Sequence, residues 1–434
     1  MTTRVTAVLS GAGQRGFYNY GPYALQYPEE LRFVAVAEPN PARRVRFAAA
    51  HNISPECQFA SWEDLVGQGR IADAFFNTTQ DQTHYPSTLA ALAAGYDVLL
   101  EKPMANRLAE NIALVQAAER SGRLLQVCHV LRSTPFFSTL HIILASGRLG
   151  DIITVEHREN VVSWHMAHSY VRGHWRNAAM ASPMILAKCC HDLDLLTWNL
   201  GCEVIRLHSF GSLIHFRPEN APPGATARCT DGCPAGDQCP FDARRLYLDP
   251  DRTGWPVSVI SEDLTRDARE RALQTGPYGR CVYFCDNDVV DHQTVNMEFE
   301  GGTTAVLFMH GHSHEESRTM RYDGTRATLR GKFTYAGGRI EVHDHLTGRR
   351  EELVIPPAES GHGGGDFGVV RSFLGAVRGE MPPLTSAREA LESHLLAFAA
   401  EEARVNRTVV TMSDFRRRAE AGAPVPVDHA RRSP

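Results

Sequence analysis

The sequence VTAVLSGAGQRG, residues 5–16, decides the fold of the first part of the chain. The apolar run Val5–Ser10 leads directly into Gly11-x-Gly13-x-x-Gly16. A strand that enters such a turn and then a helix is typical of a dinucleotide-binding βαβ unit, in which the glycines permit a tight turn, close approach of a pyrophosphate and helix–strand packing. The alternative is a structural turn without a ligand. We expect the following residues to contact a dinucleotide: Gly11, Gly13, Gln14, Arg15 and Gly16.

Further strand patterns follow this turn, and helical stretches separate them. Continuous apolar strands that alternate with helices predict a parallel sheet covered on both faces. We therefore expect residues 1–128 to form a doubly wound α/β (Rossmann) domain, with Gly21-Pro22 breaking the first helix. The expected strands lie at residues 33–37, 72–76 and 97–100, and the expected helices at 85–94 and 105–121.

From residue 129 the pattern changes to a helix at 135–146 and then to strands joined by glycine turns. We expect residues 129–434 to form an α+β domain with a largely antiparallel open sheet, a Cys-bearing insertion at about 217–285 and a helix at 386–404. That helix begins at the capping box Ser386-x-x-Glu389. The basic tail after Asp414 is expected to fray. The expected strands lie at 152–162, 204–216, 294–299, 303–310, 327–330 and 339–343.

Composition limits the possible functions. The chain has 45 basic and 50 acidic residues, a formal charge of −5, which argues against a nucleic-acid-binding protein. No apolar run is long enough to span a bilayer, and no secretion signal is recognisable at the start. Ten cysteines without such a signal indicate reduced thiols or metal ligands. We expect a cytoplasmic protein without a membrane or nucleic-acid partner.

Two charged residues at strand ends indicate chemistry. Glu38 ends the second strand, where it can accept hydrogen bonds from ribose hydroxyls and would repel a 2′-phosphate. This favours NAD over NADP, although Arg43 and Arg44 nearby leave NADP open. Lys102 follows the strand at 97–100, at the sheet edge where ligands of such sheets bind, and its ammonium can donate to a substrate hydroxyl or share its proton. A solvent-exposed loop lysine is the alternative.

Several motifs together resemble the Gfo/Idh/MocA oxidoreductase superfamily. They are the glycine turn, Asn77-Thr78-Thr79-Gln80-Asp81 with His84, Glu101-Lys102-Pro103, Arg132 with Pro135, and Gly147-x-x-Gly150-Asp151-Ile152. More loosely, Gly363-Gly364-Gly365-Asp366 and the last helix also fit. The resemblance implies that Lys102 lies beside a nicotinamide, that Glu101 holds its ribose, and that residues Asn77, Thr78, Thr79, Gln80 and His84 line the cofactor.

The resemblance also implies an acid–base histidine on a helix of the second domain. His191 fits this residue and Asp194 the acid that follows it. The acid usual one turn earlier is replaced by Ala187, so Lys188 or Asp192 is expected to take its role. A histidine packed in the core is the alternative for His191.

The substrate side is less clearly marked. The segment 163–177 is dense in Trp, His and Arg, the residue types that line sugar sites, although a loop packed on the domain edge would look the same. The expected substrate-facing residues are Arg132, Trp164, His165, Arg172 and Trp175. His168 is a further candidate for the pocket wall.

The cysteines of the insertion have ligand-like spacing. Thiolates on a structural zinc, or on an iron–sulfur cluster, would stabilise a segment with little apolar content. Unliganded thiols or one disulfide are the alternatives. The expected ligands are Cys229, Cys233, Cys239 and Cys281.

Together these features predict an NAD-dependent dehydrogenase for a secondary alcohol of a sugar, cyclitol or related polyol, working as a homo-oligomer. Two alternatives stay open. One is a glycoside hydrolase that oxidises its sugar transiently with NAD, and the other is a sensor that binds NAD and sugar without catalysis.

Overall fold

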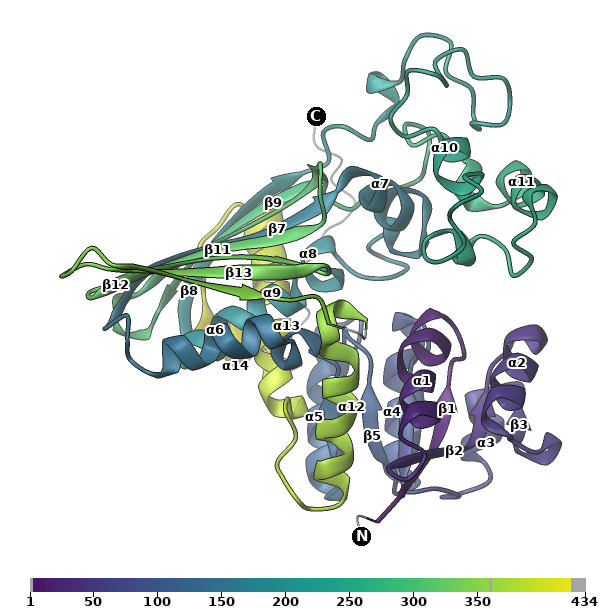
Figure 1. The fold of residues 1–434 in the computed structure, drawn as a ribbon, viewed down its shortest axis with the longest axis horizontal. Helices are drawn as coiled ribbons and strands as arrows, with labels where there is room; N and C mark the ends of the chain where they lie inside the picture. Colours follow the sequence, from purple (N-terminus) through teal and green to yellow (C-terminus); the bar gives the residue numbers. More distant parts are fainter. Residues whose placement is uncertain (1–2, 359–360, 423–434) are drawn as a thin grey trace.

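The computed structural model describes residues 3–358 and 361–422 as two sheets joined side by side, with a loop-rich insertion above them (Figure 1). The first sheet has six parallel strands in the order β3-β2-β1-β4-β5-β6. These strands are β1 Val5–Ser10, β2 Leu31–Ala37, β3 Gln58–Phe59, β4 Ala74–Asn77, β5 Asp97–Leu100 and β6 Leu125–Val127. This confirms the predicted doubly wound sheet.

Helices cover both faces of this sheet. A π-helical turn, η1 Gln14–Tyr20, follows the glycine turn, and a new helix begins at Gly21-Pro22 as expected. The helices are α1 Gly21–Gln26, α2 Pro41–His51, α3 Trp62–Val66, α4 Asp81–Ala93 and α5 Leu108–Ser121. The helix α12, Gly365–Val377, returns from far along the chain, and its buried side chains join those of β1, β2 and β4 in one core.

The second sheet has nine strands in the order β14-β13-β12-β11-β7-β10-β9-β8-β15. Only the pairing of β7 with β10 is parallel, so the predicted, largely antiparallel sheet is confirmed. The strands are β7 Ile152–Val162, β8 Val204–Ser212, β9 His292–Phe299, β10 Thr304–Ser313, β11 Ser317–Gly324, β12 Ala327–Thr334, β13 Gly337–Asp344, β14 Arg350–Ile355 and β15 Val410–Thr411. The strands β11, β14 and β15 were not predicted.

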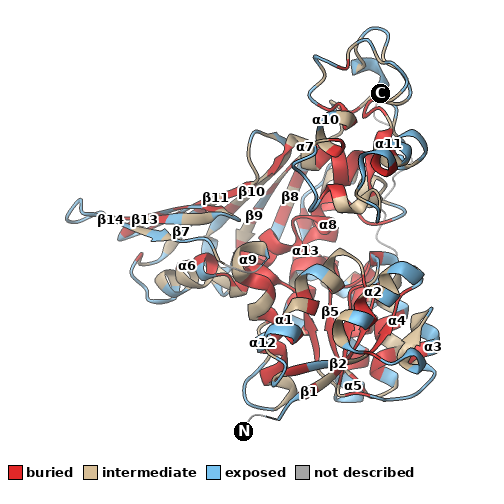
Figure 2. Cartoon of the chain, turned by 45° about the vertical axis from the view of Figure 1, so that its right-hand side comes forward, coloured by how far each residue is buried: buried red, intermediate tan, exposed pale blue. Residues whose placement is uncertain are grey.

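Helices of the second part cover its sheet (Figure 1). They are α6 Pro135–Ala145, α7 Ser163–His165, α8 Met184–Ala187, α9 Cys190–Leu200, α13 Ala387–Asn406 and α14 Met412–Glu420. Of these, α13 and α14 also pack on α5 of the first domain, whereas α7 lies beside the insertion (Figure 1). The predicted capping box starts α13, which is buried along most of its length (Figure 2). The expected fraying after Asp414 is wrong as far as residue 420, because Met412, Phe415 and Ala419 bury one face of α14. Residues 423–434 lie outside the described part.

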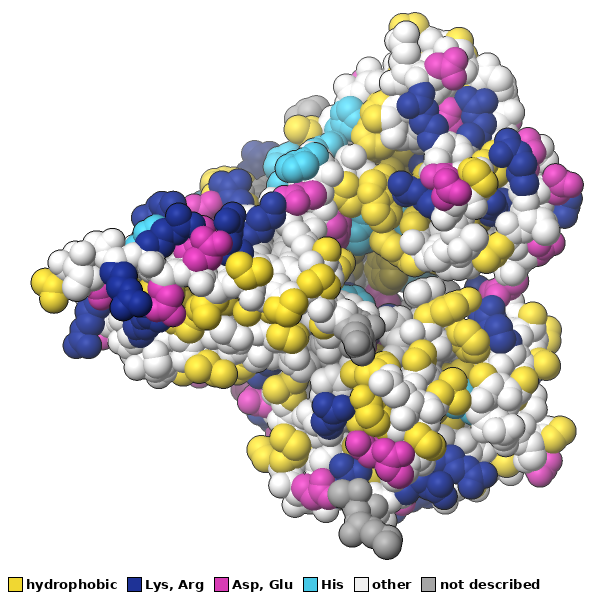
Figure 3. Space-filling model, in the orientation of Figure 1, with side chains coloured by type: hydrophobic (Ala, Val, Ile, Leu, Met, Phe, Trp, Pro, Cys, Tyr) yellow, Lys and Arg dark blue, Asp and Glu magenta, His cyan; other side chains and the backbone are white. Residues whose placement is uncertain are grey.

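The insertion contains two short helices, α10 Ala243–Tyr247 and α11 Arg266–Thr275, with a small core of its own. It stands above the first domain on the side of α2 (Figure 1), and a recess with hydrophobic side chains opens beside it toward the second sheet (Figure 3). Among the described helices, none is both long and apolar enough to cross a bilayer.

Candidate active site

The glycine turn lies at the carboxyl end of β1 and is packed against the loop after β4. Gly11 has φ +94°, and a Cβ there would lie 2.5 Å from the carbonyl oxygen of Thr78, while one at Gly16 would lie 2.2 Å from the carbonyl oxygen of Gly11. At Gly13 a Cβ would meet only the Arg43 guanidinium, 3.9 Å away. Packing therefore requires glycine at positions 11 and 16. At position 13 the absence of a side chain leaves open space, and a bound pyrophosphate needs such space to approach the backbone.

Glu38 stands beside this turn at the end of β2. It is buried, and its two carboxylate oxygens accept hydrogen bonds from the backbone N–H groups of Ala12 (2.8 Å) and Asn40 (2.9 Å). These bonds fix the carboxylate, and each oxygen keeps a lone pair for a further donor. The arrangement suits a carboxylate that receives ribose hydroxyls.

The end of β5 carries a second fixed carboxylate, Glu101. Arg15 and the hydroxyl of Tyr20 each donate to Glu101 Oε1 over 2.5 Å, and Arg15 also donates to Asp366 over 2.7 Å. Burial opposes the ionisation of Glu101, but the charge of Arg15 and the Tyr20 bond outweigh it, so its pKa lies below the ordinary value. The sequence did not predict Tyr20 as a partner of Glu101 or Asp366 as a partner of Arg15, because these contacts join segments far apart in the sequence.

The loop after β4 braces the glycine turn. The amide of Asn77 donates to the hydroxyls of Ser87 and Thr88, and the hydroxyl of Thr78 donates to the carbonyl of Gly11. His84 Nδ1 lies 2.7 Å from the carbonyl oxygen of Pro103. Thr79 is half-buried and Gln80 is exposed. Asn77, Thr78 and His84 therefore fix the glycine turn and the neighbouring loops through contacts within the protein.

Lys102 connects the two domains at the predicted reaction centre. Its ammonium donates to the carbonyl oxygen of Ala187 over 2.9 Å, one turn before His191. Burial lowers the pKa of His191 well below the ordinary value, and the charge of Lys102 lowers it further. His191 Nδ1 is buried and has no hydrogen-bond partner among the described residues. A neutral imidazole can accept a proton from a hydroxyl, and the charge of Lys102 acts on this one.

Asp194 and Arg132 lie together, which differs from the roles expected for them. Two parallel hydrogen bonds of 2.8 and 2.7 Å join the guanidinium to the carboxylate, and both side chains are buried. Asp194 also lies 4.0 Å from the ring of His129, whose centroid is 5.5 Å from that of His191. The carboxylate therefore contacts His191 only through an intervening ring, and the guanidinium of Arg132 is occupied by a protein partner.

Lys188 is likewise held in a buried charge network away from the predicted dyad. Its ammonium lies 2.8 Å from Glu316 and 3.2 Å from Glu159. Burial raises the pKa of Glu159 to about 7 against the opposing charges of Arg318 and Lys188. Asp192 belongs to the same network through Arg318, at 2.8 Å, and His157. Neither Lys188 nor Asp192 contacts His191 through a described side-chain bond.

The residues expected to face the substrate do not all lie on one wall. Trp164 and His165 lie at the end of β7, and Trp255 of the insertion packs against both, with ring centroids 5.4 and 4.9 Å away. Trp175 donates to Asp81 over 2.8 Å and so joins the wall to the first domain. The expectation that Arg172 faces the substrate is wrong. Its side chain is buried against the insertion and donates to the carbonyls of Arg280 and Phe241. Nothing in its local sequence distinguished this orientation.

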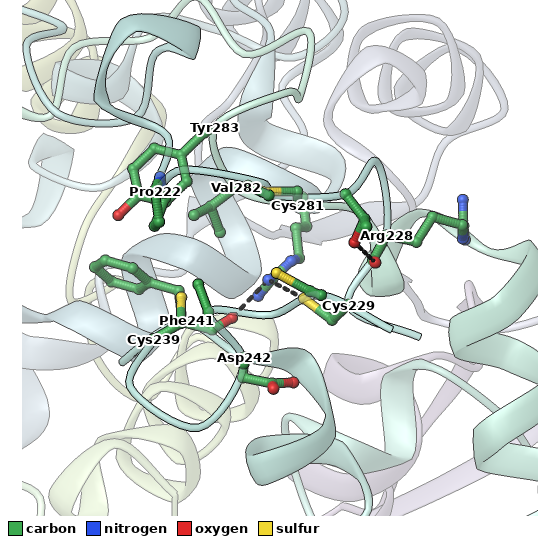
Figure 4. Close-up of a pocket in the computed structure, with 15 residues that line it drawn as sticks. Pro222, Arg228, Cys229, Cys239, Phe241, Asp242, Cys281, Val282 and Tyr283 are labelled. Carbon is green, nitrogen blue, oxygen red and sulfur yellow. Dashed lines mark hydrogen bonds between the residues drawn. The ribbon is translucent and has the colours of Figure 1, made fainter. Parts of the chain in front are cut away.

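The four cysteines expected to bind a metal line one pocket with an empty volume of about 350 Å³ (Figure 4). Within residues 3–358 and 361–422, however, no three His, Cys, Asp or Glu side chains converge as ligands for a metal ion. The guanidinium of Arg172 enters this pocket, and its Nη2 lies 3.6 Å from Cys229 Sγ. The guanidinium of Arg172 thus lies against one of the four thiols, and the predicted ligands share a pocket without converging as a ligand set among the described residues.

Comparison with family profiles matches both parts of the chain. Residues 5–129 match an oxidoreductase family with an NAD-binding Rossmann fold, and residues 143–412 match the C-terminal alpha/beta domain of that family. Putative oxidoreductase YteT of Bacillus subtilis is 21% identical over 304 residues, which cover 66% of this chain and 68% of the relative. Inositol 2-dehydrogenase 4 of Saccharopolyspora erythraea is 31% identical over 200 residues, 44% of this chain and 52% of the relative.

Solved structures share the whole fold at low identity. The WlbA dehydrogenase of Chromobacterium violaceum, in complex with NADH and UDP-GlcNAcA, has a TM-score of 0.66 at 16% identity and covers 95% of this chain and 96% of its own. An oxidoreductase of Agrobacterium radiobacter, in complex with NAD+, L-tartaric acid and magnesium, has a TM-score of 0.68 at 16% identity, with coverage of 95% and 99%.

Proposed function

The chain belongs to the Gfo/Idh/MocA oxidoreductase family, and we propose that it is an NAD-dependent dehydrogenase for a secondary alcohol of a sugar, cyclitol or related polyol. One observation carries the proposal. The Lys102 ammonium at the carboxyl end of β5 donates to the Ala187 carbonyl one turn before His191, so that an ammonium and an imidazole come together where the two domains meet.

The chain's own residues fit the cofactor. The open space at Gly13 and the start of η1 would hold the pyrophosphate, Glu38 the adenosine ribose and Glu101 the nicotinamide ribose. When bound, NAD accepts the hydride of the carbinol carbon. Glu38 favours NAD over NADP, because a 2′-phosphate would meet its fixed negative charge.

Lys102 and His191 would act on the alcohol. The ammonium donates to the hydroxyl oxygen and stabilises the negative charge that develops on it. His191, kept neutral by burial, would accept the hydroxyl proton. Asp194, paired with Arg132, fixes the position of the neighbouring His129 and so acts as a positioning residue.

The proposed substrate class rests on the side chains that are expected to face the substrate. Trp164, Trp175 and Trp255 offer aromatic faces, and His165 and His191 offer polar edges, the combination that recognises a polyol ring. Inositol dehydrogenases among the relatives support the same class.

The test is reduction of NAD and NADP by the purified protein across a panel of sugars, sugar acids and inositols. Turnover with at least one of them is expected, and turnover with none would refute the proposal. Release of aglycone from a glycoside, with catalytic NAD and no net NADH, would instead establish the hydrolase. Tight binding of NAD and sugar without turnover would establish the sensor.

Assembly and compartment are part of the proposal. The second sheet is open and exposes the apolar side chains of Ile153, Phe210 and Val354, which favours self-association. The proposed compartment is the cytoplasm. Light scattering after gel filtration should give a mass that is a multiple of 48.0 kDa. A monomer would refute the homo-oligomer.

A further inference from the structure

The insertion makes a direct ionic contact with the first domain beside the glycine turn. Glu262, just before α11, lies 2.5 Å from Arg43 Nε and 2.9 Å from Arg46 Nη1. Both arginines belong to α2, the helix that follows Glu38. The three side chains are each about one third exposed. One carboxylate from the insertion thus pairs with two guanidinium groups at the adenosine end of the proposed cofactor site.

Arg43 lies near the strand end at which a 2′-phosphate is expected to bind. It lies in the first turn of α2, and its guanidinium is 3.9 Å from the Cβ position of Gly13. In dinucleotide-binding domains an arginine near this strand end accommodates the 2′-phosphate of NADP. Arg43 therefore has the chemistry for NADP, and what its guanidinium binds decides which cofactor is preferred.

None of the three arginines at this end of α2 is left without a partner in the described structure. Glu262 holds Arg43 and Arg46, and Arg46 also lies over the ring of Phe17, 4.3 Å from its centroid. Arg44 donates to the carbonyl oxygen of Glu38. A 2′-phosphate would have to displace Glu262 and would be repelled by two carboxylates, whereas a ribose hydroxyl needs neither change.

We propose that Glu262 is a specificity-determining residue, through which the insertion selects NAD against NADP by holding Arg43 and Arg46. The inference rests on the proposed function, since it requires a dinucleotide at the glycine turn. It adds a residue outside the Rossmann domain to the discrimination that Glu38 provides. It also gives the Cys-bearing insertion a role at the cofactor.

The test compares binding of NADH and NADPH to the full-length protein by titration calorimetry. Glu262→Gln removes the charge and keeps the shape. NADPH should then bind at least about fivefold more tightly, the equivalent of about 1 kcal/mol for an exposed ion pair, while NADH affinity stays within about twofold. The matched control is Glu270→Gln on α11, an exposed carboxylate without an ion pair to a described residue, which should change neither affinity.

A second variant tests the route of the effect. In an Arg43→Ala background, Glu262→Gln should lose most of its gain for NADPH, because the freed guanidinium is the partner of the phosphate. An unchanged NADPH affinity in Glu262→Gln, or an equal gain for NADH, would overturn the inference and leave the proposed function intact. Failure of the wild-type protein to bind either dinucleotide would overturn both.

Discussion

Breaking the ion pair between Arg132 and Asp194 should cost the protein much of its stability. Asp194→Asn removes the charge that receives two hydrogen bonds, and Arg132, about 5% exposed, cannot reach water instead. Loss of one partner of a buried pair costs about 3–5 kcal/mol, or two to three and a half powers of ten in the folding equilibrium. Because a hydrophobic pair of similar volume avoids the buried charge, Arg132→Met with Asp194→Leu should recover most of the loss.

Urea unfolding followed by tryptophan fluorescence measures this effect, since Trp198 lies 5.3 Å from the Arg132 guanidinium. Burial opposes ionisation of Asp194, but Arg132 outweighs it and lowers the pKa below 3.8. The pair's stabilisation is therefore present above the unfolded pKa and lost as pH falls through the folded one, so wild type and Asp194→Asn should converge in acid. The control Glu351→Gln, in an exposed pair with Arg148, should cost at most about 1 kcal/mol. A loss below about 1 kcal/mol in Asp194→Asn, or no recovery in the double variant, would refute the reasoning.

Three further outcomes follow from the site. Lys102→Met should lower turnover about 10²- to 10⁴-fold while NADH still binds, and an unchanged rate would remove Lys102 from the mechanism. Since burial lowers the pKa of His191 well below 6.5, the acid limb of kcat/KM for alcohol oxidation should lie below pH 6.5 and disappear in His191→Asn; a limb at or above pH 6.5 would contradict this. Arg172→Met should destabilise the insertion by about 2–3 kcal/mol and admit limited proteolysis within 217–285, whereas the exposed Arg217→Met should not.

The fold was largely predictable because its signals are local. The apolar run of β1 ends in glycines whose spacing serves the turn itself, and the capping box of α13 lies within four residues. The strands β11 and β14 were missed for a physical reason as well. Strand β14 alternates between half-buried and exposed residues at a sheet edge, so it carries no apolar run, and β11 buries Arg318 in an ion-pair network.

The partners of charged site residues were not predictable, because each pair joins distant segments. Arg132 reaches Asp194 on α9, Arg15 reaches Asp366 on α12, and Glu262 reaches α2 from the insertion. A sequence reveals that such residues are charged, but not which opposite charge the fold brings beside them. Composition also does not reveal which way each side chain of the segment 163–177 points: Trp164 packs against Trp255, and Arg172 turns into the cysteine pocket.

Lys188 shows how a spacing argument fails. Its position three residues before His191 predicts a shared helix face, but only if one helix runs through both residues. The structure instead ends α8 at Ala187 and begins α9 at Cys190, and Cys189 between them is not helical. The break turns the Lys188 side chain toward Glu159 and Glu316, while the Ala187 carbonyl becomes free to accept the Lys102 ammonium. The backbone break therefore explains why Lys188 leaves the expected helix face and why the Ala187 carbonyl becomes the partner of Lys102.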